Sequence, residues 1–199
     1  MSSPASCASA LALAAGLLLA AGAGADEKKV ELNVGDPAPV FQLPDEKGAS
    51  WSSSDHVGKR WVVIYFYPGD FTPGCTAQAN AFRDAMNKLT ELGVEVVGVS
   101  GDSVRTHELF RKAQKLNFTL LSDEDGAVAK RFGVPFGPGG KARAKDADGK
   151  VVEIERAGTA ARWTFIIGRD GKVAYKNTKV NPVLDAKKVA EFITQAGEK

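Results

Sequence analysis

Two apolar runs, Trp61–Tyr67 and Val94–Ser100, constrain the fold of this chain more than any other feature of its sequence. Both are rich in β-branched and aromatic residues and lack the polar alternation of a half-solvated strand, so each predicts a strand buried on both faces. Between them, apolar residues recur at helical spacing from Ala79 to Leu92, and Gly93 ends the pattern. This strand–helix–strand unit predicts parallel strands and an α/β fold with helices on both faces of the sheet.

The rest of the chain continues this alternation and then changes it. The further elements that we expect are a helix capped by Asp102 or Ser103, a strand at 118–121, a helix at 125–132, two strands at 163–167 and 173–175, and a last helix at 185–195. Asp170-Gly171 indicates a hairpin turn between the two late strands, which would therefore be antiparallel. The sequence thus predicts a central mixed sheet flanked by helices.

Three stretches carry weaker patterns. Residues 26–44 are interrupted by glycine and prolines and predict an irregular lead-in, whereas residues 49–52 could form a short edge strand. Residues 135–160 combine a Gly/Pro-rich start with a charged run and predict an exposed loop, in which 151–154 could pair with a sheet edge. Because the sequence shows neither an internal repeat nor a second domain, we expect a single domain over residues 26–199.

The first 25 residues differ in composition from the rest. They contain no Asp, Glu, Lys or Arg, and Leu11–Ala21 is an almost continuous Leu/Ala run. Such a run suits the core of a signal peptide, about 7–15 residues, and is shorter than the roughly 20 residues of a membrane span. Ala23-Gly24-Ala25 offers a cleavage site, so we expect residues 1–25 to be a signal peptide, and the protein to be periplasmic or secreted, without stable membrane insertion. An uncleaved anchor and a mis-assigned start codon are the alternatives, because no Lys or Arg precedes the run.

Cleavage would leave one cysteine. The chain contains Cys7, within the predicted signal peptide, and Cys75. Exported proteins usually pair their cysteines, so a single one indicates a reactive thiol or an intermolecular partner. An inert buried cysteine is the alternative.

The charges of the chain are balanced, with 26 Lys+Arg against 24 Asp+Glu and a formal net charge of +2. This balance predicts neither nucleic-acid binding nor strong attraction to a membrane surface.

Cys75 lies where a thiolate would be stabilised. It follows the first buried strand in the segment Pro68–Thr76, and a helix is expected to begin near Gly74. The free N–H groups and the positive dipole end of a helix start favour the ionised thiol. No Lys, Arg or His lies within residues 68–81, so any cationic partner must come from elsewhere in the fold.

The motif around this cysteine resembles that of a known family. The pattern Pro68-x-x-x-Thr72-x-x-Cys75 resembles the active-site motif of the peroxiredoxins. The wider stretch from Tyr65 to Asp84 is similar to their bacterioferritin-comigratory-protein, or PrxQ, branch. Further matches to that branch follow in order and are Gly98–Ser103 with His107, Leu120–Asp123, Phe132–Val134 and Arg162–Ile167.

The resemblance implies a thioredoxin-like fold and thiol-dependent reduction of hydrogen peroxide and organic hydroperoxides. Cys75 would be the peroxidatic nucleophile, oxidised to a sulfenic acid. Thr72 would hydrogen-bond the sulfur or the peroxide, and Pro68 would shield the intermediate from water. Arg162 would supply the cation that stabilises the thiolate and the departing oxygen. The resemblance also implies a monomer or weak dimer that needs no metal, haem or flavin.

One departure from the branch concerns the reduction of oxidised Cys75. Many members carry a resolving cysteine five residues later, where this chain has Asn80. We therefore expect a one-cysteine cycle in which an external thiol, such as glutathione, a glutaredoxin or a thioredoxin-like protein, reduces the sulfenic acid.

Three other polar residues near these motifs are ambiguous. Gln78 stands where many relatives carry Glu, and both a supporting hydrogen bond and a solvated helix position are open. His107 matches the branch and is expected at the helix surface or in local packing. Because His56 and His107 are isolated in the sequence, neither predicts a metal site.

Three rival functions fit the sequence less well. A thiol–disulfide oxidoreductase would use Cys-x-x-Cys, but Gln78 stands at the place of the second cysteine. A copper carrier would need a further soft or imidazole ligand near Cys75. A non-enzymatic peroxide-sensing or binding module remains the alternative to an enzyme, although such a module would not need the peroxide-activating residues Thr72 and Arg162.

Overall fold

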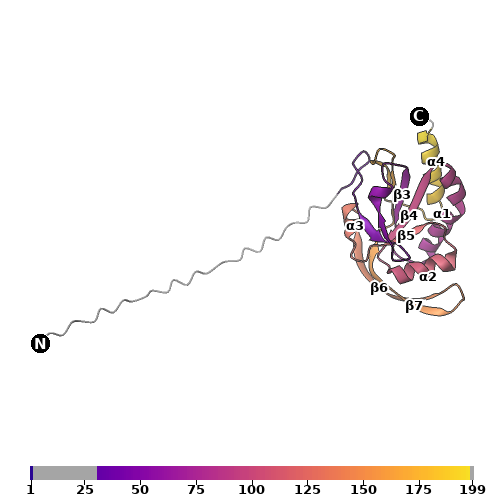
Figure 1. The fold of residues 1–199 in the computed structure, drawn as a ribbon. Helices are drawn as coiled ribbons and strands as arrows, with labels where there is room; N and C mark the ends of the chain where they lie inside the picture. Colours follow the sequence, from indigo (N-terminus) through magenta and orange to yellow (C-terminus); the bar gives the residue numbers. More distant parts are fainter. Residues whose placement is uncertain (2–30, 198–199) are drawn as a thin grey trace.

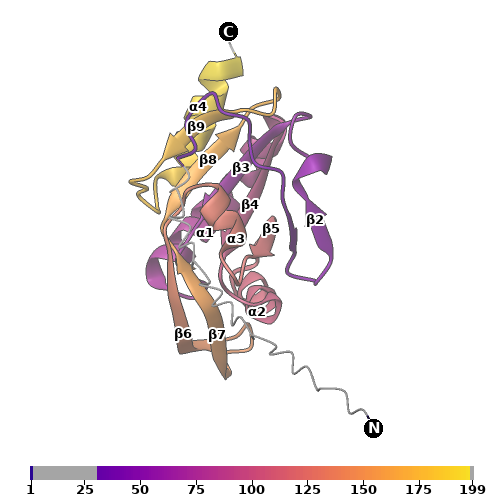
Figure 2. The same ribbon diagram turned by 90° about the vertical axis from the view of Figure 1, so that its left-hand side faces the viewer.

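The computed structural model describes Met1 and residues 31–197, and Figures 1 and 2 show its ribbon in two views. Apart from Met1, the predicted signal peptide lies outside the described residues. Within the described part, no helix combines the length and the apolar character needed to cross a bilayer.

A five-stranded mixed sheet forms the centre of the structure, in the strand order β5-β4-β3-β8-β9. The strands are β3 (Trp61–Phe66), β4 (Val94–Ser100), β5 (Thr119–Ser122), β8 (Trp163–Ile167) and β9 (Val173–Asn177). The first three run parallel, whereas β8 is antiparallel to β3 and β9 is antiparallel to β8. The mixed sheet and the late hairpin predicted from the sequence are therefore confirmed.

Helices cover both faces of this sheet, as Figure 1 shows. They are α1 (Pro73–Glu91), α2 (Val104–Gln114), α3 (Ala127–Arg131) and α4 (Asp185–Gly197). Because successive side chains of a strand point to opposite faces, Val63 and Tyr65 of β3 join the core under α1, α2 and α4, and Ile64 and Phe66 join the core on the α3 side. Ser103 caps α2, as predicted, with its Oγ accepting from the backbone N–H of Thr106 at 3.3 Å.

The lead-in is more regular than predicted. Its strand β1 (Gln42–Pro44) pairs antiparallel with β2 (Ser50–Ser52), and the 3-10 turn η1 (Ser53–Asp55) follows. Residues 31–41 form no helix or strand beyond an isolated bridge at Pro37, in agreement with the irregular lead-in expected there, and the expectation is wrong only for Gln42–Pro44. The short strand expected near residues 49–52 is confirmed.

The expected loop at 135–160 is a β-hairpin. Strand β6 (Phe136–Lys145) pairs antiparallel with β7 (Val151–Ala160), and the pair extends past α2 (Figure 2). Gly101 and Gly158 let β7 pack against the end of β4, because a Cβ on Gly101 would lie 2.3 Å from the Gly158 carbonyl oxygen. The Ala157 N–H donates to the Gly101 carbonyl at 2.9 Å, and Phe136 and Ala160 pack into the core on the α3 side. A backbone contact and apolar packing at one end therefore both hold this hairpin.

Candidate active site

Cys75 lies in the first turn of α1 and is 1% exposed. The helix begins at Pro73, where the fixed φ of proline and its missing N–H suit the first helical position. Thr72 precedes it with an extended backbone, at φ −74° and ψ 146°. The sulfur therefore sits where N–H groups lack intrahelical acceptors and the helix dipole is positive.

Arg162 brings a positive charge to this sulfur from a distant part of the chain. It lies between β7 and β8, and its Nη2 donates to Cys75 Sγ at 3.2 Å. Gly74 permits the approach, because a Cβ there would crowd Nη2 at 3.3 Å. The fold thus brings together two of the four predicted site residues and places a guanidinium donor beside the sulfur.

The other two predicted residues lie in the loop from β3 to α1. Pro68 is half-buried directly after the strand. The Thr72 hydroxyl donates to the Gly69 carbonyl at 3.1 Å. Because its proton is engaged, this hydroxyl can act toward a peroxide only as an acceptor, through its lone pairs.

Phe71 sets the direction in which the loop enters α1. Its backbone is left-handed, at φ 61°, which is unusual for a bulky residue. Its ring packs edge-on against Phe110 of α2 with centroids 5.0 Å apart. This contact anchors the turn that precedes Thr72.

A buried acid–base pair lies beneath the loop. Asp70 and His107 are both 0% exposed, and Oδ2 of the aspartate lies 2.7 Å from Nδ1 of the imidazole. Nε2 of His107 donates to the Leu121 carbonyl at 3.2 Å, and the Tyr67 hydroxyl donates to Asp70 Oδ1 at 2.8 Å. The expectation of local packing for His107 is met, and the helix-surface alternative is wrong.

The pKa values of both members of this pair are raised. Burial alone would lower the pKa of His107, but the charge and hydrogen bond of Asp70, with smaller contributions from Asp102 and the Leu121 carbonyl, outweigh it and raise that pKa. Burial raises the pKa of Asp70 as well, although the charge of His107 opposes this shift.

This pair predicts a stability that falls as the pH rises. Because the folded-state pKa of His107 lies above its ordinary value of 6.5, its contribution is complete below pH 6.5 and is lost as the pH rises through the raised pKa. Each unit of that shift corresponds to about 1.4 kcal/mol. We expect urea unfolding midpoints to fall across this window in the wild-type protein and to change less in His107→Gln. Equal slopes for the two proteins would contradict the assignment.

A second arginine connects the β6–β7 hairpin to the same loop. Arg156 of β7 donates through Nη2 to the Asp70 carbonyl at 2.9 Å and through Nε to Asp102 Oδ1 at 3.2 Å. The other oxygen of Asp102 accepts from the backbone N–H of Asp70 at 2.9 Å. The hairpin therefore holds the loop that precedes Cys75, a role that its charged sequence did not reveal.

Gln78 is 0% exposed, so the solvated position considered for it is wrong. Its Oε1 accepts a short hydrogen bond from Arg162 Nη1, and its Nε2 donates to Asp185 Oδ2 at 2.7 Å. The supporting hydrogen bond considered for Gln78 is therefore present. Sequence reasoning did not single out Asp185, at the start of α4.

Asn80 occupies the place of the resolving cysteine and connects α1 to α2. Its Nδ2 donates to Gln114 Oε1 at 3.3 Å, and its Oδ1 accepts from Arg83 Nη1 at 3.0 Å. Cys75 is the one cysteine within the described residues, and it forms no disulfide there.

His56 lies apart from this site. Its ring stacks on Trp51 at 4.5 Å, and its Nδ1 lies 2.7 Å from Glu95 Oε2. Across residues 31–197, no group of three or more His, Cys, Asp or Glu side chains gathers in a way that could hold a metal ion.

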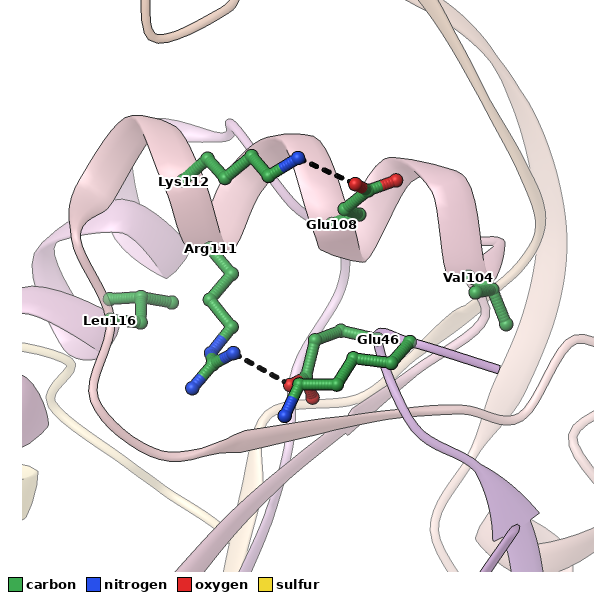
Figure 3. Close-up of a pocket in the computed structure, with 7 residues that line it drawn as sticks. Glu46, Val104, Glu108, Arg111, Lys112 and Leu116 are labelled. Atoms are coloured by element: carbon green, nitrogen blue, oxygen red, sulfur yellow. Dashed lines mark hydrogen bonds and ion pairs between the residues drawn. The ribbon is translucent and has the colours of Figure 1, made fainter. Parts of the chain in front are cut away.

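A surface hollow of about 570 Å³ lies beside α2 (Figure 3) and is lined by Glu46, Lys47, Val104, Glu108, Arg111, Lys112 and Leu116. Four of its charged side chains form two ion pairs, because Arg111 bonds Glu46 at 2.8 Å and Lys112 bonds Glu108 at 2.6 Å. None of the predicted site residues lines this hollow.

Comparison with known proteins identifies the family. A family model described as the AhpC/TSA family matches residues 34–176, more than half of the chain. The chain belongs to the AhpC/TSA family. The predicted resemblance to the peroxiredoxins and their PrxQ branch is thereby confirmed, because the relatives are named accordingly.

Two relatives illustrate this branch. Chloroplastic peroxiredoxin Q of Sedum lineare is 51% identical over 122 residues, which cover 59% of this chain and 65% of that protein. Putative peroxiredoxin bcp of Coxiella burnetii is 47% identical over 146 residues, which cover 73% and 87%. The matched region spans 59–65% of the length of the Sedum lineare and rice relatives.

Solved structures confirm the thioredoxin-like fold of this peroxiredoxin. Peroxidoxin BcpB of Mycobacterium tuberculosis superposes with a TM-score of 0.68 at 31% identity, over 83% of this chain and 98% of that one. The bacterioferritin comigratory protein of Xanthomonas campestris, studied for its alkyl peroxide reduction activity, gives 0.64 at 31% identity, over 80% and 92%.

Proposed function

We propose that this chain is a thiol-dependent peroxidase that reduces hydrogen peroxide and organic hydroperoxides through Cys75. The observation that carries the proposal is the 3.2 Å hydrogen bond from Arg162 to a buried sulfur in the first turn of α1. The similarity to the Xanthomonas campestris protein supports the same activity.

In the first step, the Cys75 thiolate attacks the terminal oxygen of the peroxide. An S–O bond forms as the O–O bond breaks, the sulfur gives up two electrons, and the other oxygen leaves as an anion that takes a proton to become water or an alcohol. Thr72 Oγ1 accepts the hydrogen bond of the peroxide O–H, and Arg162 stabilises both the thiolate and the charge on the departing oxygen. Pro68 shields the sulfenic acid from water.

In the second step, an external thiol reduces the sulfenic acid. It attacks the sulfur of Cys75, releases water and forms a mixed disulfide, which a second thiol then resolves. Asn80 supports this one-cysteine cycle, because it stands in the place of the resolving cysteine and is bonded to α2. Glutathione, a glutaredoxin or a thioredoxin-like protein could each supply the thiol.

The test is peroxide consumption by the purified protein with and without each thiol in excess. An enzyme should turn over repeatedly with at least one thiol, and a mixed disulfide or a trapped sulfenic acid should appear on Cys75 by mass spectrometry. A single stoichiometric burst with every thiol would favour the peroxide-sensing module instead. A stable intrachain disulfide would refute the one-cysteine cycle.

We propose in addition that the protein is exported to the periplasm or secreted, and acts as a monomer or weak dimer. The composition of residues 1–25 supports export. Mass spectrometry of the mature N-terminus distinguishes cleavage after Ala25 from a chain that keeps Met1.

A further inference from the structure

We propose that Asp185 is a positioning residue, which acts through Gln78 to hold Arg162 against Cys75. The effect on turnover rests on the peroxidase function proposed above, whereas the effect on the ionisation of the thiol does not. The proposal adds a carboxyl group from α4 to a site otherwise formed by α1 and the segment before β8.

A continuous chain of hydrogen bonds carries this inference. Asp185 Oδ2 accepts from Gln78 Nε2 at 2.7 Å, Gln78 Oε1 accepts from Arg162 Nη1, and Arg162 Nη2 donates to Cys75 Sγ at 3.2 Å. Thr164 of β8 fixes the far end, because its hydroxyl donates to the same Asp185 oxygen at 2.7 Å.

The chemistry of the end groups determines which way the amide of Gln78 points. A guanidinium can only donate and an ionised carboxylate can only accept, whereas an amide has one donor end and one acceptor end. Only one orientation of Gln78 therefore satisfies both neighbours, with its oxygen toward Arg162 and its nitrogen toward Asp185. Without an acceptor at position 185, this orientation would lose its fixed partner, and Arg162 would lose a fixed acceptor.

Burial makes this orientation costly to change. Gln78 and Thr164 are 0% exposed and Asp185 is 1% exposed, so little water can replace a lost partner. Asp185 Oδ1 has no hydrogen-bond partner within the described residues. The hydrogen bonds that this carboxyl accepts, from Gln78 and Thr164, therefore both go to Oδ2. Burial raises the pKa of Asp185, and the bonds from Thr164 and Gln78 and the charge of Arg162 oppose that shift.

One other ionisable side chain shares this interior. Tyr65 of β3 is 1% exposed, and burial raises its pKa well above 10.0, with further increases from the charges of Asp70, Cys75 and Asp185. It therefore stays neutral at physiological pH. Of the charged groups around it, which are Asp70, Asp185 and Arg162, Arg162 is the one that donates to the Cys75 sulfur.

A positioning role of Asp185 and a purely electrostatic effect of its charge predict opposite shifts in the pH at which Cys75 ionises. A carboxylate acting on Cys75 only through space would disfavour the thiolate, so Asp185→Ala and Asp185→Asn would both make the thiolate easier to form. A positioning role predicts a different result. Asp185→Ala removes the acceptor and should move thiolate formation to higher pH, whereas Asp185→Asn keeps an acceptor oxygen and should not.

The experiment measures the thiolate by its ultraviolet absorbance across pH, with Cys75→Ser as the baseline, and the rate of sulfenic acid formation with hydrogen peroxide. We expect Asp185→Ala to slow that step by about 10–100-fold and Asp185→Asn to recover most of the loss. Gln78→Met breaks the chain of hydrogen bonds between Asp185 and Arg162 but leaves Asp185 bonded to Thr164. It should therefore reproduce the result of Asp185→Ala even if the Asp185→Ala protein folds poorly.

Asp123→Ala is the matched control. Asp123 is also 1% exposed and accepts two backbone hydrogen bonds at the start of α3, so its loss should lower stability without moving the thiolate titration. The proposal is overturned where Asp185→Ala and Gln78→Met leave the titration in place, or shift it to lower pH. A shifted titration in a protein without peroxidase turnover would instead overturn the proposed function and leave the positioning role standing.

Discussion

Cys75→Ser is expected to reduce thiol-dependent peroxide consumption to the rate measured without protein. Serine is close in size to cysteine, but its hydroxyl does not ionise at neutral pH without an adjacent general base. The imidazole of His107 cannot serve as that base, because it is engaged by Asp70 at 2.7 Å and by the Leu121 carbonyl. A serine oxygen also cannot take up the peroxide oxygen as the thiolate sulfur does when it becomes a sulfenic acid. Peroxide loss in the presence of each thiol measures the effect.

Cys7→Ser, tested in the chain that keeps residues 1–25, is the matched control, because it removes the other cysteine of the chain outside the motif of Cys75. We expect full turnover from Cys7→Ser and an unfolding midpoint of Cys75→Ser close to that of the wild type. Turnover that survives in Cys75→Ser would refute the mechanism. Loss of turnover in both variants would instead indicate that Cys7 resolves the oxidised sulfur.

The central sheet could be predicted because its signals are local. The run that forms β3 is apolar and aromatic throughout, the run that forms β4 contains a single charged residue, Glu95, and Asp170-Gly171 marks the turn between β8 and β9. Burial on both faces explains the missing polar alternation, since alternate residues of β3 enter two different cores. Near-continuous runs of β-branched and aromatic residues are typical of parallel strands that are buried on both faces.

The β6–β7 hairpin could not be predicted from the same signals. Most of β6 is exposed, so its sequence carries no hydrophobic period. On β7 the exposed and buried positions alternate toward the end, but the charged residues among them conceal the pattern. The strands are held by their own backbone ladder, by the contact between Gly101 and Gly158, and by Phe136 and Ala160, which pack into the core at one end of the hairpin. The backbone contacts cannot be recognised from composition, and two apolar residues do not form a periodic pattern.

Some residues of the candidate site could likewise be predicted from the sequence, and others could not. Cys75 and Thr72 belong to a local motif at a predicted helix start. Arg162 is predicted only by the resemblance to the peroxiredoxins and not by its spacing from Cys75 in the sequence. Asp185 lies 107 positions from Gln78, and an aspartate at the start of a helix ordinarily indicates a cap. The contacts of Asp185 with Gln78 and Thr164 exist only because the fold brings α1 and β8 next to the start of α4.

Arg162→Met is expected to slow the oxidation of Cys75 by about 10²–10³-fold, the usual cost of removing one donor from a site of developing negative charge. Methionine fills part of the same volume but can neither donate to Cys75 Sγ nor stabilise the departing oxygen. The thiolate should also form at higher pH in this variant. Single-turnover oxidation by hydrogen peroxide measures the effect, and varying the thiol separately shows whether the reductive step changes less.

Arg162→Lys separates charge from geometry. Lysine keeps the positive charge, but its single ammonium lacks the planar fork that lets Arg162 donate to Cys75 and Gln78 at once. We therefore expect a rate between those of the wild type and Arg162→Met. A rate equal to the wild type would mean that charge alone is sufficient and that the connection to Gln78 is dispensable. A rate within twofold of the wild type in Arg162→Met would remove this arginine from the oxidation step, and the 3.2 Å contact would then be structural.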